Sequence, residues 1–272
     1  MNFVEKLTNI VRRNKSLLCI GLDPDPVLMP DKLRISEFNK AIIEATSDLV
    51  CAYKPNLAFY ESLGDEGLKA LRYTIECIPD YIPIIGDAKR GDIGNTAKAY
   101  AKAIFDNLGF DATTVNPYLG FDSIEPFIKY TDRGIFILCR TSNAGAVDFQ
   151  SLQCESEPGS RPLFEIVAQK ASQWNIHGNI GLVVGATYPE ELRLIRQNHP
   201  DMPLLIPGVG TQGGDLALAV RDGVNVRGEG IILNSSRQIL YSSRETDFAQ
   251  AARRVASELR DQINYYRFNP TL

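Results

Sequence analysis

Short apolar runs recur along the chain at nearly even intervals, and every run ends in polar or glycine-rich positions. Apolar runs that are bounded by turn residues are typical of buried β-strands. The pattern predicts strands at residues 17–22, 51–56, 82–89, 112–115, 134–139, 180–184, 204–206 and 230–233. Each predicted strand therefore ends in a tip that can carry polar chemistry.

Between these runs, apolar residues recur at helical spacing, which predicts amphipathic helices. A leading helix is predicted around Phe3, Leu7 and Ile10. Further helices are predicted at residues 36–50, 66–78, 96–108, 123–130, 162–174, 189–197, 215–221 and 247–265. The polar stretch 144–160 is predicted to be a loop, and its unusual length suggests a functional lid.

The regular alternation of strands and helices predicts the fold class. Eight strand–helix units in 272 residues, with no low-complexity segment or linker between them, fit an α/β fold of the (β/α)₈ (TIM) barrel type. A doubly wound sheet is the alternative, but it would have fewer strands and a less regular recurrence. We therefore predict a single barrel domain over residues 1–272, with an extra N-terminal helix.

The composition suits a globular protein and limits its partners. Hydrophobic residues make up 44% of the chain and the net charge is −4, so there is no electrostatic case for nucleic acid or an anionic membrane. An anionic small molecule is still allowed, because the charges within a site decide that. The first residues mix charged with apolar side chains, unlike a signal peptide, and no apolar stretch is long enough to span a bilayer.

The five cysteines indicate a reducing environment. None forms a CxxC pair, and Cys19 and Cys139 fall inside apolar, strand-like runs. Buried thiols are therefore expected, rather than metal ligands or disulfides. This usage predicts a cytoplasmic location.

A dense group of charges follows the third predicted strand. Asp87 and Lys89 alternate along that strand, so their side chains share a face and lie roughly 6–7 Å apart along the chain. Asp92 comes next, and in a barrel the strand tips that carry Asp23 and Lys54 meet at the same face. Carboxylates beside a lysine keep it protonated, which suits a general acid. The alternative is a cluster of surface ion pairs without a catalytic role, which would contribute little to stability.

The tips of the seventh and eighth predicted strands have the composition of a phosphate site. Residues 208–214 read GVGTQGG, and glycine-rich backbone can bring N–H groups close to an anion. Gly210 and Gln212 lie in this loop, and Arg237 after the eighth strand can add a bidentate contact. Barrels often bind phosphate at these two tips. The alternative is that the glycines only make a tight turn.

The remaining tips predict neither a nucleophilic triad nor a metal site. They carry Asn116 and Ser142, while His177 and His199 fall in loops that we expect at the surface. A metal site needs carboxylate or imidazole ligands without competing ammonium groups. Lysines at two of the tips therefore argue against a metal.

Several of these segments together resemble one known family. They are KPN at residues 54–56, DAKRGDIGNT at 87–96, VNPYLG at 115–120, PGVGTQ at 207–212 and NSSR at 234–237. The combination resembles orotidine 5′-phosphate decarboxylase over nearly the whole chain. The run at 87–96 is highly specific, and the NPYLG and NSSR segments point to the longer-chain subfamily.

The resemblance implies a carboxy-lyase that converts orotidine 5′-monophosphate to UMP and CO₂, the last step of de novo pyrimidine synthesis. It implies no metal and no organic cofactor. Lys89 would protonate C6 of the pyrimidine, and Asp87 would lie against the departing carboxylate. Lys54 and Asp23 would contact the ribose.

The resemblance also implies a homodimer with shared active sites. Asp92, Ile93 and Thr96 would then serve the active site of the partner chain. The remaining substrate contacts are implied for Asn116 at its strand tip, for Ser142 at the pyrimidine edge, and for Gly210, Gln212 and Arg237 at the phosphate.

Three other interpretations are open at this point. A Mg²⁺-dependent relative such as 3-hexulose-6-phosphate synthase resembles the Asp-x-Lys-x-x-Asp run, but it has a carboxylate near the second strand, where this chain has Lys54. A Schiff-base aldolase could use Lys89. A catalytically silent nucleotide-binding protein is the third, although a silent site has no need to bury costly charges.

Overall fold

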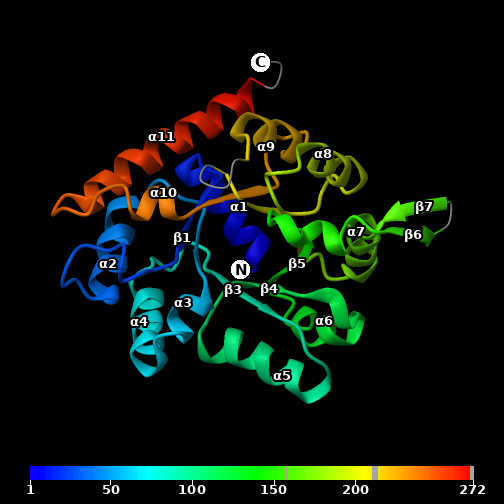
Figure 1. The fold of residues 1–272 in the computed structure, drawn as a ribbon, viewed down its shortest axis with the longest axis horizontal. Helices are drawn as coiled ribbons and strands as arrows, with labels where there is room; N and C mark the ends of the chain where they lie inside the picture. The colour runs from blue at the N-terminus through cyan, green and yellow to red at the C-terminus, as the bar shows by residue number, and fades with distance from the viewer. Residues whose placement is uncertain (157–158, 210–213, 270–272) are drawn as a thin grey trace.

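Eight parallel strands form the centre of the molecule in the computed structural model, which describes residues 1–156, 159–209 and 214–269 (Figure 1). The strands are β1 (Leu18–Leu22), β2 (Ala52–Pro55), β3 (Ile85–Arg90), β4 (Ala112–Val115), β5 (Gly134–Arg140), β8 (Ile180–Val184), β9 (Leu204–Pro207) and β10 (Ile231–Ser235). Their order in the sheet is β2-β1-β10-β9-β8-β5-β4-β3. Each strand thus lies beside its neighbours in the chain.

Two single bridges join the first and last strands of this order. Tyr53 pairs in parallel with Ile84, and Asn56 pairs in parallel with Asp87. The sheet therefore closes into a barrel, and the predicted (β/α)₈ fold is confirmed. The third strand begins three residues later than predicted, at Ile85, because Pro83 has no N–H to donate to a ladder.

Helices follow the strands and cover the outside of the barrel (Figure 1). They are α1 (Phe3–Asn14), α2 (Ile35–Thr46), α3 (Leu57–Glu61), α4 (Gly64–Cys77), α5 (Gly94–Lys102), α6 (Phe121–Ile128), α7 (Leu163–Trp174), α8 (Pro189–Asn198), α9 (Leu216–Gly223), α10 (Arg237–Leu240) and α11 (Phe248–Phe268). A π-helical turn (Ala103–Asn107) follows α5, and a 3₁₀ turn (Pro117–Leu119) follows β4. No helix of the described residues is long and apolar enough to cross a membrane.

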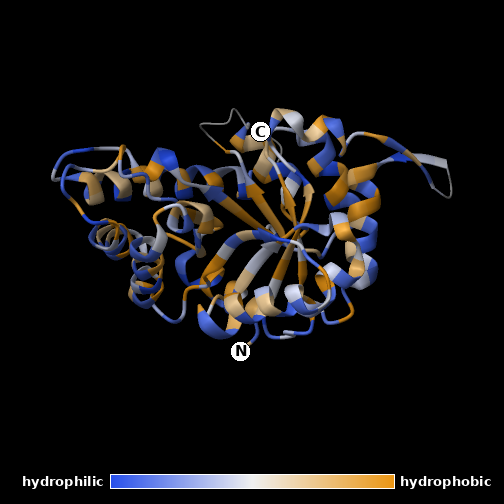
Figure 2. Cartoon of the chain, turned by 60° about the horizontal axis from the view of Figure 1, so that its bottom comes forward, coloured by the Kyte–Doolittle hydropathy of each residue, from blue (hydrophilic) through white to orange (hydrophobic). Residues whose placement is uncertain are grey.

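The strands are apolar because both of their faces are covered. β1, β2, β4, β8 and β10 are buried at every position, and Figure 2 shows the hydrophobic strands inside a shell of helices with polar outer faces. Cys19 and Cys139 are buried in this core, as predicted, and Cys51 is buried with them. Burial of apolar surface on this scale supplies the main driving force for folding.

The predicted leading helix, α1, covers the N-terminal end of the barrel. The Phe3 ring packs edge-to-face on Phe136 of β5, with 5.7 Å between the ring centroids, and Lys6 Nζ lies 2.8 Å from Asp111 Oδ2 just before β4. Gly134 makes room for this contact, since a Cβ there would lie 2.4 Å from the Phe3 ring. The opposite end of the barrel remains open for a site.

The prediction of a long loop at residues 144–160 was wrong. A 3₁₀ turn (Ala144–Asp148) is followed by an antiparallel hairpin of β6 (Gln153–Ser156) and β7 (Gly159–Pro162), which projects from the body of the molecule beside α7 (Figure 1). The hairpin strands lack the apolar alternation that marks a half-buried strand, since they pair with each other and none of their residues is fully buried. Gly159, with φ +116°, turns the chain into β7.

Candidate active site

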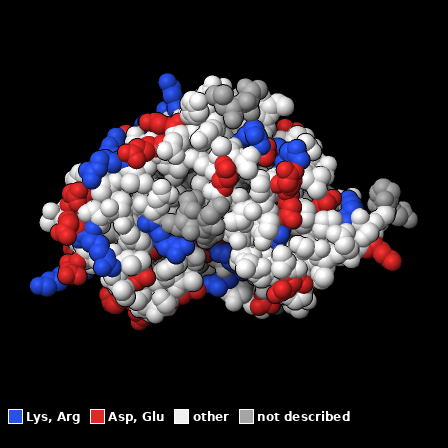
Figure 3. Space-filling model, turned by 45° about the horizontal axis from the view of Figure 1, so that its top comes forward, with Lys and Arg blue, Asp and Glu red and all other residues white. Residues whose placement is uncertain are grey.

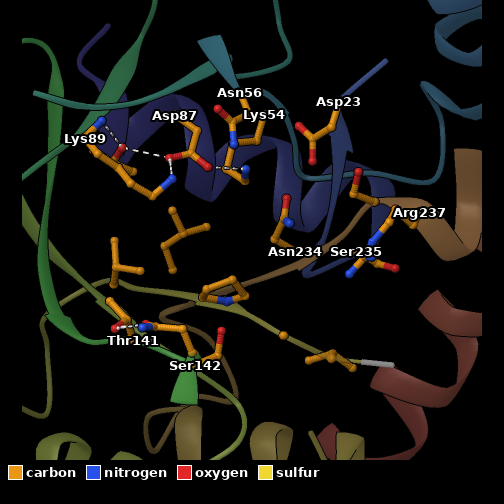
Figure 4. A pocket seen from close by; sticks show the side chains of 18 of the residues that line it. Asp23, Lys54, Asn56, Asp87, Lys89, Thr141, Ser142, Asn234, Ser235 and Arg237 are labelled. Atoms are coloured by element: carbon orange, nitrogen blue, oxygen red, sulfur yellow. Dashed lines mark hydrogen bonds and ion pairs between the residues drawn. The ribbon is translucent and has the colours of Figure 1, made fainter. Parts of the chain in front are cut away.

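A cavity of about 710 Å³ opens at the C-terminal ends of the barrel strands. This volume lies in the range typical of small-molecule sites. Figure 4 shows Asp23, Lys54, Asp87 and Lys89 along one wall, with Ser142 on the facing wall. Lys, Arg, Asp and Glu side chains are interspersed over the face of the molecule that Figure 3 presents.

Asp87 lies between two ammonium groups. Its Oδ2 accepts a hydrogen bond of 2.7 Å from Lys54 Nζ, and its Oδ1 accepts one of 2.6 Å from Lys89 Nζ (Figure 4). The Lys54 and Asp87 side chains are 5% and 10% exposed, whereas the Lys89 side chain is 49% exposed. The structure therefore brings these three residues of the predicted array together at the cavity, and Lys89 is the most exposed of them.

The charges of this array stabilise one another against the cost of burial. Burial alone would raise the pKa of Asp87, but the attraction of Lys54 and Lys89 outweighs it, so the pKa lies well below its usual range. Burial would likewise lower the pKa of Lys54, but Asp87 and Asp23 outweigh that effect and raise the pKa instead. Asp87 and Lys54 are therefore both ionised at neutral pH.

The backbone at Lys89 is unusual. Its φ of +47° lies in the left-handed region that residues other than glycine rarely adopt. The Lys89 N–H donates to Thr114 Oγ1 at 3.0 Å, and Thr114 Oγ1 donates to Asp87 Oδ1 at 3.0 Å. Strained backbone of this kind persists where the surroundings fix it, and it is concentrated at functional sites.

Three buried polar atoms near the array have no hydrogen-bond partner among the described residues. They are Asp23 Oδ1, Asn234 Oδ1 and Ser235 Oγ. All three side chains line the cavity, and Figure 4 shows Asn234 between Asp23 and the facing wall. Buried polar groups are expensive to leave unpaired, so this part of the wall is suited to a polar ligand.

Arg237 lines the same cavity at the start of α10, directly after β10. Gly208, with φ +93°, lines it after β9. The other residues predicted for the phosphate, Gly210 and Gln212, lie outside the described residues. The described part of the predicted phosphate site thus reaches the cavity from the two expected strand tips.

Ser142 reaches the cavity from the end of β5. Gly185 allows this approach, because a Cβ there would lie 2.8 Å from Ser142 Cβ. Next to Ser142, the Thr141 N–H donates a hydrogen bond of 2.8 Å to the side-chain oxygen of Gln150. The Arg140 guanidinium donates to Glu191 and lies 3.7 Å from the centre of the Tyr188 ring. These contacts tie the end of β5 to the following loop and to α8.

Four predicted site residues do not line the cavity of this chain. They are Asp92, Ile93, Thr96 and Asn116. Asn116 was predicted at the site, but its Oδ1 accepts the Tyr118 N–H at 3.1 Å and caps the 3₁₀ turn instead. Asp92 Oδ1 accepts the N–H of its own neighbour, Ile93, at 2.8 Å.

The described residues hold no group of three or more His, Cys, Asp or Glu side chains arranged to bind a metal ion. The carboxylate oxygens of Asp87 are both paired with ammonium groups. His177 is exposed, His199 is half-buried, and neither lines the cavity. The described residues that line the cavity therefore offer carboxylates, ammonium groups, the Arg237 guanidinium and neutral hydrogen-bonding side chains.

Comparison with known proteins supports the resemblance. The model of the orotidine 5′-phosphate decarboxylase / HUMPS family matches residues 16–255. The chain belongs to this family. It is 57% identical over 267 residues to the orotidine 5′-phosphate decarboxylase of Dehalococcoides mccartyi, covering 98% of this chain and 99% of the relative.

Solved structures in the family share the fold. The orotidine monophosphate (OMP) decarboxylase of Leishmania donovani is 41% identical with a TM-score of 0.87, and the match covers 98% of this chain and 100% of that chain. The UMP synthase of the same organism is 43% identical with a TM-score of 0.89, covering 98% of this chain and 57% of that chain. Both neighbours share the barrel over nearly the whole of this chain.

Some cavity residues were missed by the sequence analysis. Asn234 and Ser235 belong to the NSSR segment at residues 234–237, but the sequence predicted no role for them. Thr114 was hidden inside a predicted strand, although two consecutive threonines in a buried strand are a signal that polar groups there need partners. Asn56 and Tyr241 also line the cavity.

Proposed function

We propose that the chain decarboxylates orotidine 5′-monophosphate to UMP and CO₂, with Lys89 as the proton donor. The observation that carries the proposal is the position of Lys89. Its ammonium group is half-exposed in the cavity and is held 2.6 Å from Asp87, whose other oxygen binds the buried Lys54. The family membership of the chain supports the choice of substrate.

The reaction needs only one proton and a stabilised carbanion. The bond between C6 and the carboxylate carbon breaks, CO₂ leaves, and the electron pair remains on C6 of the pyrimidine. The Lys89 ammonium stabilises that charge by proximity and then transfers a proton to C6, which gives UMP. A preorganised cation at the point where charge develops favours the transition state over the ground state.

In this proposal, Asp87 and Lys54 hold the Lys89 ammonium group in position. Asp87 fixes the Lys89 ammonium and lies against the departing carboxylate, and Lys54 keeps Asp87 ionised. Because Asp87 is 10% exposed and already paired twice, its position is fixed before substrate binds. Such prior fixing removes reorganisation from the chemical step.

The rest of the substrate extends along the cavity in this proposal. Asp23 and Lys54 bind the ribose, Ser142 the pyrimidine edge, and Arg237 the phosphate together with Gly210 and Gln212. The support is the placement of Asp23 and Arg237 on the same cavity as the charge array. Binding energy from the phosphate, remote from C6, can then contribute to catalysis.

We also propose that the protein is cytosolic and that two chains form a dimer with shared active sites. Asp92 follows β3 but lies outside the cavity of its own chain. Ile93 and Tyr118, which follow the neighbouring strands β3 and β4, are 53% and 79% exposed. Apolar side chains exposed at adjacent strand ends suit an interface, and Asp92 would enter the partner's cavity there.

The activity is tested by ultraviolet absorbance of orotidine 5′-monophosphate mixed with the purified chain and excess EDTA. A steady loss of the orotate band, absent with Lys89→Ala, is the expected result. No loss with folded protein that binds UMP would indicate a silent nucleotide-binding protein. Turnover of a sugar phosphate only after Mg²⁺ is restored would indicate the alternative activity, that of a Mg²⁺-dependent enzyme such as 3-hexulose-6-phosphate synthase.

The dimer is tested by mixing two inactive variants, Lys89→Ala and Asp92→Asn. Random pairing makes half of the dimers mixed, and each mixed dimer has one site with both native residues. The mixture should therefore regain about a quarter of the wild-type activity. Shared sites would be excluded if the mixture is as inactive as its components although mass spectrometry shows that mixed dimers have formed.

A further inference from the structure

We infer that Thr114 is a positioning residue for the proton donor: its hydroxyl group holds Asp87 and Lys89 in their working arrangement. The inference rests on the proposed function, because it concerns the same site. Thr114 is 1% exposed and lies on β4, beside the strand that carries both charged residues.

The hydrogen-bond geometry gives the Thr114 hydroxyl a definite direction. Its oxygen accepts the backbone N–H of Lys89 at 3.0 Å, and it lies 3.0 Å from Asp87 Oδ1. The ionised carboxylate has no proton to donate, so the single hydroxyl proton of Thr114 points to Asp87. One hydroxyl group thus joins the side chain of Asp87 to the backbone of Lys89.

This bridge occurs where the sheet is irregular. Gly86 of β3 pairs with Thr113 of β4, but the next pair in the ladder is Arg90 with Val115. Residues 87–89 therefore face a single residue of β4, Thr114, and the backbone ladder is interrupted there. The Thr114 side chain supplies the acceptor that the Lys89 N–H would otherwise find in the ladder.

The same bridge fixes the strained backbone of Lys89. Its φ of +47° carries an energetic cost for a residue with a Cβ, and tertiary contacts have to maintain it. Without the hydroxyl group, the Lys89 N–H and Asp87 Oδ1 would each lose a partner. The backbone of Lys89 could then relax, and its ammonium group would leave its position near C6.

A second threonine provides a matched control. Thr113 precedes Thr114 on β4, is 0% exposed, and also donates its hydroxyl proton to β3, at 2.9 Å. Its acceptor is the backbone oxygen of Gly86 rather than the charge array. Thr113→Val therefore removes a similar buried hydrogen bond without touching Asp87 or Lys89.

The experiment compares Thr114→Val, Thr114→Ser and Thr113→Val with the wild type. We expect Thr114→Val to lower kcat by about tenfold to a hundredfold with KM changed by less than about threefold, the loss typical of a hydrogen bond to a charged group. Thr114→Ser keeps the hydroxyl group and should recover kcat to within about threefold of wild type. Thr113→Val should lose stability as Thr114→Val does but keep its kcat.

A second readout follows Lys89 directly. In D₂O the enzyme should exchange the C6 hydrogen of UMP, because removal of that proton by the neutral Lys89 amine is the reverse of product formation. The exchange rate should fall with kcat in Thr114→Val. If that variant does not fold, Thr114→Ala takes its place.

Two results would overturn the inference. One is a Thr114→Val enzyme whose kcat matches that of Thr113→Val. The other is a Thr114→Ser enzyme as slow as Thr114→Val, since shape rather than the hydroxyl group would then be responsible. A wild-type chain that does not decarboxylate orotidine 5′-monophosphate would refute the proposed function itself, which is a separate outcome.

Discussion

Lys54 and Asp87 form a buried ion pair at the mouth of the barrel, with 2.7 Å between Lys54 Nζ and Asp87 Oδ2. The two residues come from neighbouring strands whose edges are joined only by single bridges. Their side chains are 5% and 10% exposed, so water does little to screen the pair. Burying such a pair costs free energy of desolvation, and removing only one of its two charges costs more, because the other charge is then buried without a partner.

Asp87→Asn should therefore destabilise the fold as well as stop catalysis. The substitution leaves the Lys54 ammonium buried without its main counter-charge, and such a loss costs about 3–5 kcal/mol in the free energy of unfolding. Urea unfolding at pH 7 measures it. The control is Asp48→Asn, because Asp48 pairs with Arg253 at 2.6 Å but is 60% exposed, and it should cost less than about 1 kcal/mol. Equal losses for the two variants would contradict the argument.

The contribution of Asp87 should also depend on pH in one direction. The pKa of Asp87 is lower in the folded chain than its ordinary value of 3.8, because Lys54 and Lys89 outweigh the effect of burial. The folded state then binds fewer protons than the unfolded state, so the stabilisation is complete above pH 3.8 and is lost as pH falls through the folded pKa. The difference in unfolding free energy between wild type and Asp87→Asn should shrink below that pH, by up to about 1.4 kcal/mol per unit. A difference that stays constant down to the acid transition would be inconsistent with this linkage.

Arg237→Ala should weaken the binding of phosphorylated ligands selectively. Arg237 is exposed at the edge of the cavity and is proposed to bind the phosphate. Loss of a charge-assisted hydrogen bond costs about 1.5–3 kcal/mol, or roughly 10-fold to 150-fold in affinity. Calorimetric titration with UMP and with uridine separates the effects, because only the affinity for UMP should fall. A similar fall for uridine would show that Arg237 acts on the fold of the cavity instead.

Arg196 should matter for stability and not for turnover. Its buried guanidinium donates to the backbone oxygens of Gly223, His199, Pro200, Met202 and Gly230, at 2.6–3.1 Å. Burial lowers the pKa of this arginine to about 10, against the opposing attraction of Asp201. Arg196→Met would remove all of these hydrogen bonds, and among the described residues only the oxygens of His199 and Gly230 would keep another donor, the N–H groups of Met202 and Leu204.

The expected loss for Arg196→Met is about 3 kcal/mol or more in the free energy of unfolding, with kcat unchanged at a temperature where the protein is folded. Arg193→Met on the same helix is the control, because Arg193 is 53% exposed and should change stability by less than about 0.5 kcal/mol. A loss of kcat in folded Arg196→Met would indicate a link between this cluster and the site.

The strand prediction was largely right because the barrel buries both faces of its strands. Each strand is then a short apolar run with polar ends, a signal that is local in the sequence. The hairpin at β6 and β7 was missed because its strands pair with each other rather than with the core. Exposed strands of that kind carry no apolar pattern to detect.

For the candidate site, the sequence by itself determined which charged residues stand at strand tips, since Asp87 and Lys89 alternate on one strand. It also determined the family, through the run at residues 87–96. Only the tertiary structure decided how these charges are paired and which residues reach the cavity. Thr114 contacts both charged residues across an interrupted ladder, whereas Asn116, two positions on, caps a turn. Strand register and backbone angles place those groups, and they arise from packing of the whole barrel rather than from local sequence.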